Sequence, residues 1–95
     1  MAAYVIVDIE ITDPKRYDEY RRIAAPTVTA HGGRYVVRGG AVEKLEGAWK
    51  PSRLVVLEFP SAASAREWWS SEDYRPAREL RESCTNADMI VVEGV

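Results

Sequence analysis

The fold of this chain is decided by the stretch RLVVLEFPS, residues 53–61. Branched and aromatic side chains dominate it and predict a β-strand from Arg53 to Phe59. Pro60 ends that strand, and the hydroxyl of Ser61 suits the N-cap of a following helix. Because the run is almost wholly apolar, we expect both faces of the strand to be covered, as in the centre of a sheet.

The first thirty residues predict a strand and then a helix. Along Ala3–Ile11, every second side chain is apolar, and the positions between them hold both apolar and charged residues. This pattern is typical of a strand with one dry face. Asp13 and Pro14 suit the N-cap and the first position of a helix. We expect that helix to kink one turn before Pro26, which removes a backbone hydrogen bond, and to end at Gly32-Gly33.

A short strand over residues 34–38 is predicted between this helix and the central strand. Strict alternation places Tyr35 and Val37 on one face of the sheet and Arg38 on the other. The glycine pair that follows is expected to break or bulge the strand, and residues 41–45 to continue it.

Helices and one more strand are predicted after the central strand. A helix begins at Ser61, is interrupted over residues 71–74 and resumes to Asn86. Residues 88–93 then form the last strand. Of the adjacent Trp68 and Trp69, only one indole can point fully at the sheet, so the other lies at an interface, over a pocket or partly exposed.

The order strand–helix–strand–strand–helix–strand is the ferredoxin-like βαββαβ pattern of an α+β protein. It predicts a four-stranded antiparallel sheet in the order 4-1-3-2, with the helices on one face. A chain of 95 residues is expected to form one domain, residues 1–95.

We expect the second face of that sheet to pack against another protein surface. It carries Tyr4, Ile6 and Val36, together with about half of the apolar positions of the third and fourth strands. So much apolar surface is seldom left in water, and packing against an identical sheet would cover it. The same alternation puts charges on this face, where they either pair at a wet rim or line a ligand cavity. These charges are Asp8, Glu10, Arg38 and either Arg53 or Glu58.

Composition narrows the class of protein. The chain is 46% hydrophobic and 29% charged with a net charge of −2, which is ordinary for a globular protein and argues against nucleic-acid binding. Cys84 stands alone, so no intrachain disulfide forms, and a buried structural thiol is expected. No apolar run could span a bilayer and no signal peptide is recognisable, so we expect a cytoplasmic protein without a membrane partner.

Several short pieces also match a known family in order and spacing. They are Tyr20, HGGRY (31–35), RGG (38–40), LEG (45–47), residues 53–61, Ala65, Trp69, Ser71, Tyr74, Arg81 and VEG (92–94). On these pieces the chain resembles the family of domain of unknown function 1330, in the dimeric α+β barrel superfamily. The resemblance implies a ferredoxin-like protomer and a homodimer whose two sheets face each other. It implies no reaction, because that family has no general biochemical assignment.

His31 is the only histidine, and histidine is the side chain that titrates near neutrality when unperturbed. At a helix C-terminus it either caps and packs, or acts as a general acid or base at a cavity mouth with Tyr20 or Asp8 as partner. These three residues are the catalytic candidates. One histidine and one cysteine, both apart from any carboxylate cluster, do not make a metal site, and no cofactor is expected.

Five residues are candidates for ligand binding: Arg38, Arg53, Trp69, Tyr74 and Arg81. The three arginines could hold a carboxylate or phosphate through planar, paired hydrogen bonds. Alternatively they pair with acidic residues of the same fold, for which Asp8, Glu58 and Glu93 are available.

Three functions are compatible with these observations. The first is binding of a small organic molecule, in a cavity between sheet and helices, by an uncharacterised dimeric protein. The second is a cofactor-independent enzyme, a monooxygenase, isomerase or lyase-like protein acting on a small organic substrate, by analogy with superfamily relatives. The third is a purely structural or interaction dimer with a dry, charge-paired interface between its sheets. Whether the protein is an enzyme stays open.

Overall fold

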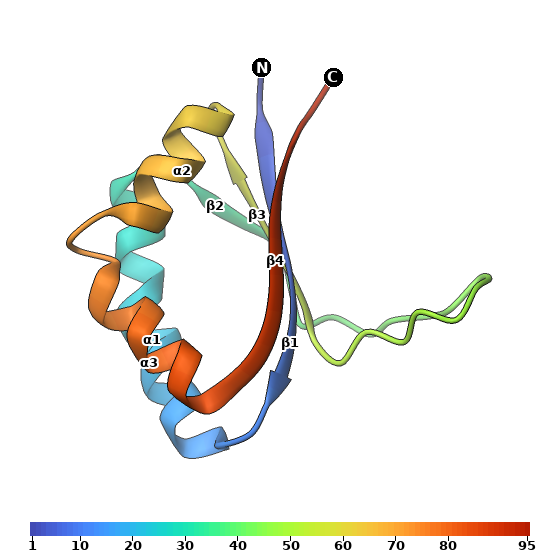
Figure 1. Cartoon of the computed structure of the whole chain (residues 1–95). Helices are drawn as coiled ribbons and strands as arrows, with labels where there is room; N and C mark the ends of the chain where they lie inside the picture. The colour runs from blue at the N-terminus through green and yellow to red at the C-terminus, as the bar shows by residue number, and fades with distance from the viewer.

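The computed structural model describes residues 1–95 and has helices on one face of a single sheet (Figure 1). Its elements are β1 (Ala3–Ile11), α1 (Pro14–Ala30), β2 (Arg34–Arg38), β3 (Leu54–Phe59), α2 (Ala62–Ser70), α3 (Arg75–Cys84) and β4 (Thr85–Glu93). The strands pair antiparallel in the order β2-β3-β1-β4. The ferredoxin-like arrangement and the central position of β1 and β3 are therefore confirmed.

Side-chain caps start the first two helices where the sequence predicts. The Asp13 carboxylate accepts a hydrogen bond from the backbone N–H of Arg16 at 3.3 Å. Ser61 and Ser64 satisfy each other's backbone N–H groups at the start of α2. Helix α1 continues through Pro26 and ends just before Gly32, whose φ of 78° suits a residue without a side chain. None of the helices is long and apolar enough to cross a membrane.

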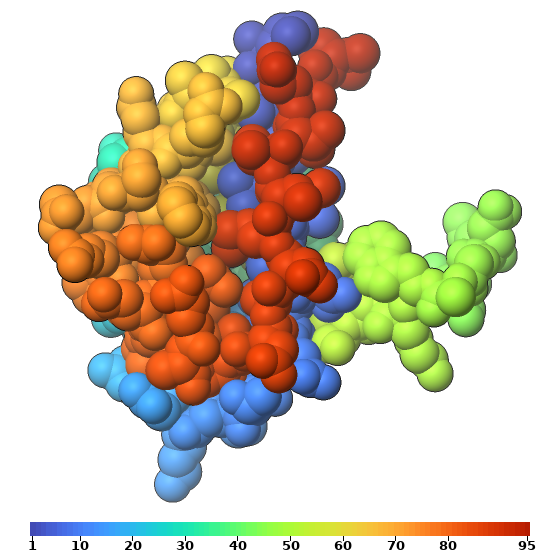
Figure 2. Space-filling model, in the orientation of Figure 1, coloured from blue at the N-terminus to red at the C-terminus, as the bar shows by residue number.

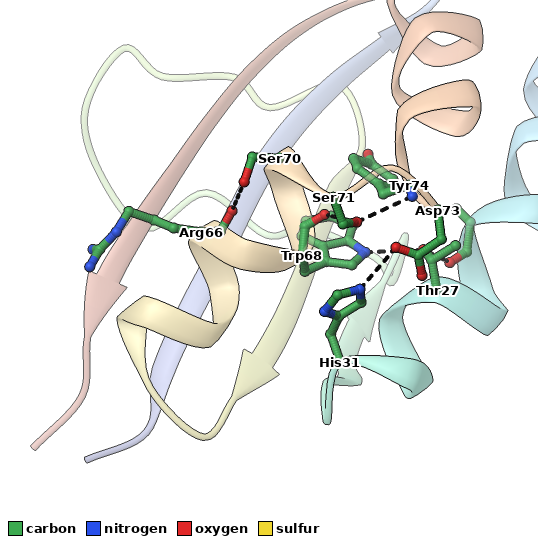
Figure 3. Close-up of polar contacts among 9 residues, drawn as sticks. Thr27, His31, Arg66, Trp68, Ser70, Ser71, Asp73 and Tyr74 are labelled. Carbon is green, nitrogen blue, oxygen red and sulfur yellow. Dashed lines mark hydrogen bonds and ion pairs between the residues drawn. The ribbon is translucent and has the colours of Figure 1, made fainter.

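The core lies between the sheet and the helices. Val5, Val7 and Ile9 of β1 are buried beside alternate residues of β3, as the period of two predicts. Trp68 is 1% exposed at the centre of the helical layer. Its ring centroid lies 4.1 Å from that of Tyr74, and its indole N–H donates to the hydroxyl of Thr27 at 3.1 Å (Figure 3). The break between α2 and α3 lets both aromatic rings reach the same core.

A bulge in β2 overturns the expected facing of Arg38. The register shifts between Tyr35 and Val37, so that Tyr35 pairs with Leu57 and Arg38 with Val55. Both partners on β3 are buried on the helix side, and Arg38 therefore lies on the same side as Tyr35. The prediction from strict alternation was wrong because one extra residue in a strand reverses the facing of everything after it.

Residues 41–45 do not continue the sheet, which corrects the second expectation for this region. Residues 39–52, called the arm below, leave the sheet and project away from it (Figures 1 and 2). The arm begins at Gly39, which has a φ of 72° and donates its N–H to the carbonyl of Leu54 at 2.8 Å. Beyond that bond no neighbouring strand is present, so the backbone of residues 41–45 has no ladder to join.

The last strand begins earlier than expected. Helix α3 ends at Cys84 rather than Asn86, and β4 starts at Thr85, opposite Ile11. Pairing with the full length of β1 extends the strand beyond the apolar residues that the sequence pattern picks out.

The face of the sheet away from the helices, called the open face below, is apolar in its middle. Tyr4 and Ile6 lie there opposite Glu58 and Val56. On β4 the corresponding positions carry Ile90 and Val92, both exposed. Glu58, not Arg53, is the β3 charge on this face.

Two acidic side chains of the open face, Glu58 and Asp8, have local partners. Glu58 accepts hydrogen bonds from the hydroxyl of Tyr4 at 3.0 Å and from Arg34 at 2.6 Å. Asp8 accepts from the indole of Trp49 and the backbone N–H of Ser52, both in the arm. These hydrogen bonds lower the pKa of both carboxyl groups below their usual values.

Candidate functional site

An apolar groove lies between α2 and the edge strand β4, where Figure 2 shows the strand crossing the front of the molecule. Its volume is about 300 Å³, which is the lower end of the range for small-molecule sites. Two arginines, Arg66 and Arg81, supply its charged atoms. Most of the other lining side chains are apolar, among them Ala65, Trp69, Met89 and Val91.

Arg81 of α3 is the polar group that makes this groove unusual. The residue is only 7% exposed, and its buried Nε atom has no hydrogen-bond partner. No carboxylate lies within ion-pair distance of it, although Glu82 and Asp88 line a polar hollow on its other side. A buried N–H donor without an acceptor is costly, and an anionic group in the groove would satisfy it.

Trp69 forms a flat wall of the groove that stays partly open to water. It is 42% exposed, whereas Trp68 beside it is buried, so the prediction that only one indole points at the sheet is confirmed. The guanidinium carbon of Arg78 lies 4.4 Å from the centre of its ring. This stacking helps to hold the indole in place.

Arg38 and Arg53 meet in a second, much smaller space between the sheet and α1. This cavity holds about 20 Å³, enough for roughly one water molecule. The Arg38 guanidinium carbon lies 4.2 Å from the centre of the Tyr35 ring, and Arg53 Nε donates to the hydroxyl of Tyr17 at 3.3 Å. Trp68 and Met89 line both spaces, so they stand between this arginine pair and the groove.

Tyr74 lies in the core rather than in the groove. It is fully buried, and its hydroxyl is 3.0 Å from the hydroxyl of Tyr20. Burial raises the pKa of Tyr20 well above its ordinary value, and the neighbouring Tyr74 adds to this shift. The phenol of Tyr20 therefore stays neutral, and the two hydroxyls are each other's hydrogen-bond partner.

The three catalytic candidates do not come together. His31 caps α1, and its Nε2 atom lies 3.0 Å from the carboxylate of Asp73 (Figure 3). Tyr20 is in the core, and Asp8 is bound by the arm at the open face. The hydrogen bond from His31 lowers the pKa of Asp73. Neither partner expected for the histidine lies next to it.

The alternative in which the candidate arginines pair with acidic residues is contradicted, because no ion pair includes Arg38, Arg53 or Arg81. Glu58 pairs with Arg34 instead, because both lie on the open face while Arg38 and Arg53 lie on the helix side.

No group of three His, Cys, Asp or Glu side chains is placed to hold a metal ion. Cys84 is fully buried, which raises the pKa of its thiol.

Sequence reasoning missed part of the groove wall. Ala65 and Met89 look like ordinary core residues, and the position of β4 at the sheet edge is what leaves them beside an opening. The available signal was Trp69, which cannot pack on the sheet together with its neighbour.

Solved structures share this fold at low sequence identity. A protein of unknown function from Rhodopseudomonas palustris aligns with a TM-score of 0.81 and 19% identity, over 99% of this chain and 82% of that one. SnoaB, a cofactor-independent oxygenase from Streptomyces nogalater, aligns with a TM-score of 0.65 and 9% identity, over 99% and 92% of the two chains. A dimeric ferredoxin-like protein of unknown function from Jannaschia aligns with a TM-score of 0.65 and 15% identity, over 99% and 100%.

The family is shown by the sequence itself. No curated protein matches it significantly. Residues 2–95, however, match the model of a family described as domain of unknown function (DUF1330). Because that match spans nearly the whole sequence, and the fold agrees with it, the chain belongs to the DUF1330 family.

Proposed function

We propose that this protein binds a small organic monoacid in the groove between α2 and β4. The observation that carries the proposal is Arg81, a residue only 7% exposed whose buried Nε has no hydrogen-bond partner, beside an apolar space of about 300 Å³. Apolar walls with a few polar or charged groups, here Arg81 and Arg66, are the usual composition of a small-molecule site.

The groove suits a molecule with one charged end and an apolar body. A carboxylate would accept hydrogen bonds from Arg81, whose planar group matches its geometry. The apolar body, aromatic or aliphatic, would lie against Trp69 and Met89. Glu82 and Asp88 line the polar hollow on the other side of Arg81 and would repel a second negative charge.

Isothermal titration with matched acids and amides tests this proposal. Benzoate, phenylacetate and hexanoate are each compared with the corresponding neutral amide at constant ionic strength. At least one acid is expected to bind about tenfold more tightly than its amide, because only the acid neutralises Arg81. Equal affinity for acids and amides, or binding of neither, would contradict the proposal.

Two variants locate the site. Arg81→Met removes the guanidinium and is expected to abolish the preference for the acid. Arg75→Met is the matched control, because Arg75 lies on the same helix but on the surface, 3.6 Å from Glu72 and 3.7 Å from Glu79. An acid preference that survives in Arg81→Met would place the anion elsewhere.

We also propose that the open face pairs with that of a second copy. Support comes from the exposed apolar residues of that face, such as Ile90 and Val92, and from the dimeric ferredoxin-like protein that shares the fold. Native mass spectrometry should show a homodimer. Val56→Glu at the middle of the open face should yield monomers, whereas Thr29→Glu on the exposed surface of α1 should not. A monomeric wild-type protein would refute this pairing.

Cofactor-independent catalysis on the same kind of ligand is the alternative. It is supported by the fold shared with SnoaB, which is described as a cofactor-independent oxygenase. Oxygen uptake is measured with each compound that the titrations identify as a ligand. Uptake that depends on Arg81 would favour the enzyme, and binding without turnover would favour the binding protein.

A further inference from the structure

Arg38 and Arg53 stand at the two ends of the arm. Arg38 is the last residue of β2, and Arg53 directly precedes β3. The hydrogen bond from Gly39 to the carbonyl of Leu54, 2.8 Å long, joins the two ends beside them. The bulge in β2 turns Arg38 to the helix side, where both arginines line the same small cavity.

Local packing places both arginine side chains beside one small cavity. Arg53 lies against the backbone at Gly39, so closely that a Cβ atom there would overlap its guanidinium. Gly39 is the residue next to Arg38, whose guanidinium stacks on Tyr35. A glycine at this point therefore lets both cations face one space.

Neither guanidinium is neutralised by the fold. The ion pairs of the protein include neither Arg38 nor Arg53. The side-chain hydrogen bond of Arg53 goes to the hydroxyl of Tyr17 and not to a carboxylate. Two unpaired arginines, held in place by aromatic rings, form a fork for an oxyanion.

The surroundings of this pair are basic. Outside the small cavity lies a hollow of about 380 Å³, whose charged side chains are Arg21, Arg22, Arg38 and a single carboxylate, Asp18. Asp18 is already paired with Arg21 at 3.4 Å. In a protein with a net charge of −2, this local excess of positive charge attracts anions to the arm's base.

We propose that Arg38 and Arg53 form an oxyanion site at the base of the arm, where one oxygen of the carboxylate or phosphate of a small molecule enters the small cavity of about 20 Å³ and the rest of that group lies in the adjoining basic hollow of about 380 Å³. An oxyanion bound by both arginines would tie the two ends of the arm together. The site goes beyond the groove around Arg81, from which Trp68 and Met89 separate it. Binding therefore has two consequences, a local contact and slower exchange of amide protons in the arm.

Nuclear magnetic resonance titration of the whole protein with inorganic phosphate, and separately with acetate, tests this site. The amide signals of Gly39 and Leu54 should shift saturably in at least one titration, and hydrogen exchange over residues 39–52 should slow. A response to phosphate alone would identify a phosphate site, and a response to acetate a carboxylate site. Absence of a saturable shift with either anion would overturn the proposal.

Variants separate a built site from general attraction to charge. Arg38→Gln and Arg53→Gln should each weaken anion binding about tenfold, because each removes half of the fork. Arg53→Lys keeps the charge without the planar fork and should also weaken it. Arg34→Gln, on the same strand but on the open face, is the matched control. An equal loss in this control would show a non-specific charge effect and refute the site.

The outcome is independent of the proposal for the groove. Arg81→Met should leave phosphate and acetate shifts at Gly39 unchanged, while Arg53→Gln should leave the acid preference of the groove unchanged. Loss of both responses in either single variant would mean that the two spaces are one site, which would overturn the present assignment.

Discussion

Replacing Arg81 by methionine should make the ligand-free protein more stable, even though it removes a candidate binding residue. Arg81 is only 7% exposed, and its Nε atom is buried without an acceptor. A ligand-binding cation placed in this way lowers the free energy of unfolding of the ligand-free protein. Methionine keeps an unbranched apolar stem of similar length and brings no polar hydrogen that needs a partner.

The magnitude follows from the buried nitrogen. An unsatisfied buried donor costs about 1–3 kcal/mol, so Arg81→Met should raise the free energy of unfolding by about that amount. For a domain of this size, each kcal/mol corresponds to a rise of roughly 4–8 °C in the melting temperature. Arg75→Met, the surface control, should stay within about 0.5 kcal/mol of wild type.

Urea denaturation followed by circular dichroism measures the effect. Protomer concentration is kept constant, because self-association makes the midpoint depend on concentration. An increase in midpoint at unchanged slope supports the reasoning. A loss of about 1 kcal/mol or more would show that Arg81 stabilises the fold, and the argument for an anion beside it would fall.

Three further predictions concern the core and the pH dependence of stability. Tyr20→Phe and Tyr74→Phe should each lower the free energy of unfolding by about 1–3 kcal/mol, since each leaves the other hydroxyl buried without a partner. In urea denaturation, the double variant should lose less unfolding free energy than the sum of the two single losses. Additive losses would show that the two hydroxyls do not interact. Gly33→Ala places a Cβ atom 2.6 Å from Phe59, so thermal melts should show a loss of about 1–3 kcal/mol, and an unchanged melt would mean that the helix end moves freely. Asp73→Asn tests the hydrogen bond that lowers the pKa of Asp73 in the folded state. The stability from that bond is fully present above the pKa of Asp73 in the unfolded chain, near 3.8, and is lost as the pH falls through the lower pKa of the folded state. The urea midpoint of the variant should therefore vary less with pH in that window than the midpoint of the wild type. Parallel plots of midpoint against pH for the two proteins would count against the bond.

Most of the fold could be predicted from local sequence signals. The alternation in Ala3–Ile11 matches its burial residue by residue, because a strand with one covered face has a period of two. The caps Asp13 and Ser61 start helices where predicted, since their side chains satisfy backbone groups only a few residues away. Such interactions act within one turn and do not depend on the rest of the chain.

The candidate site could be predicted only in part. The sequence pointed to Trp69 and Arg81, which line one groove, and to Arg38 and Arg53, which line one small cavity. It did not show that the groove and the cavity are separate sites, or that Tyr74 is buried in the core with its hydroxyl hydrogen-bonded to that of Tyr20. His31 was expected beside Tyr20 or Asp8, yet it contacts Asp73, which the chain brings to it from 42 residues away.

The sequence by itself determined the order of the elements and the faces of the central strands, because these follow from side-chain periodicity and short-range caps. It also determined the family, through motifs that match that family in order and spacing. Only the tertiary structure decided where Arg38 points, since a single bulge reverses the alternation and local propensity does not encode it. The groove likewise exists only because β4 lies at the sheet edge beside α2. Arg81 was a candidate from the sequence, but only the structure shows that its Nε lacks a partner, because whether a polar group is paired depends on contacts between distant parts of the chain.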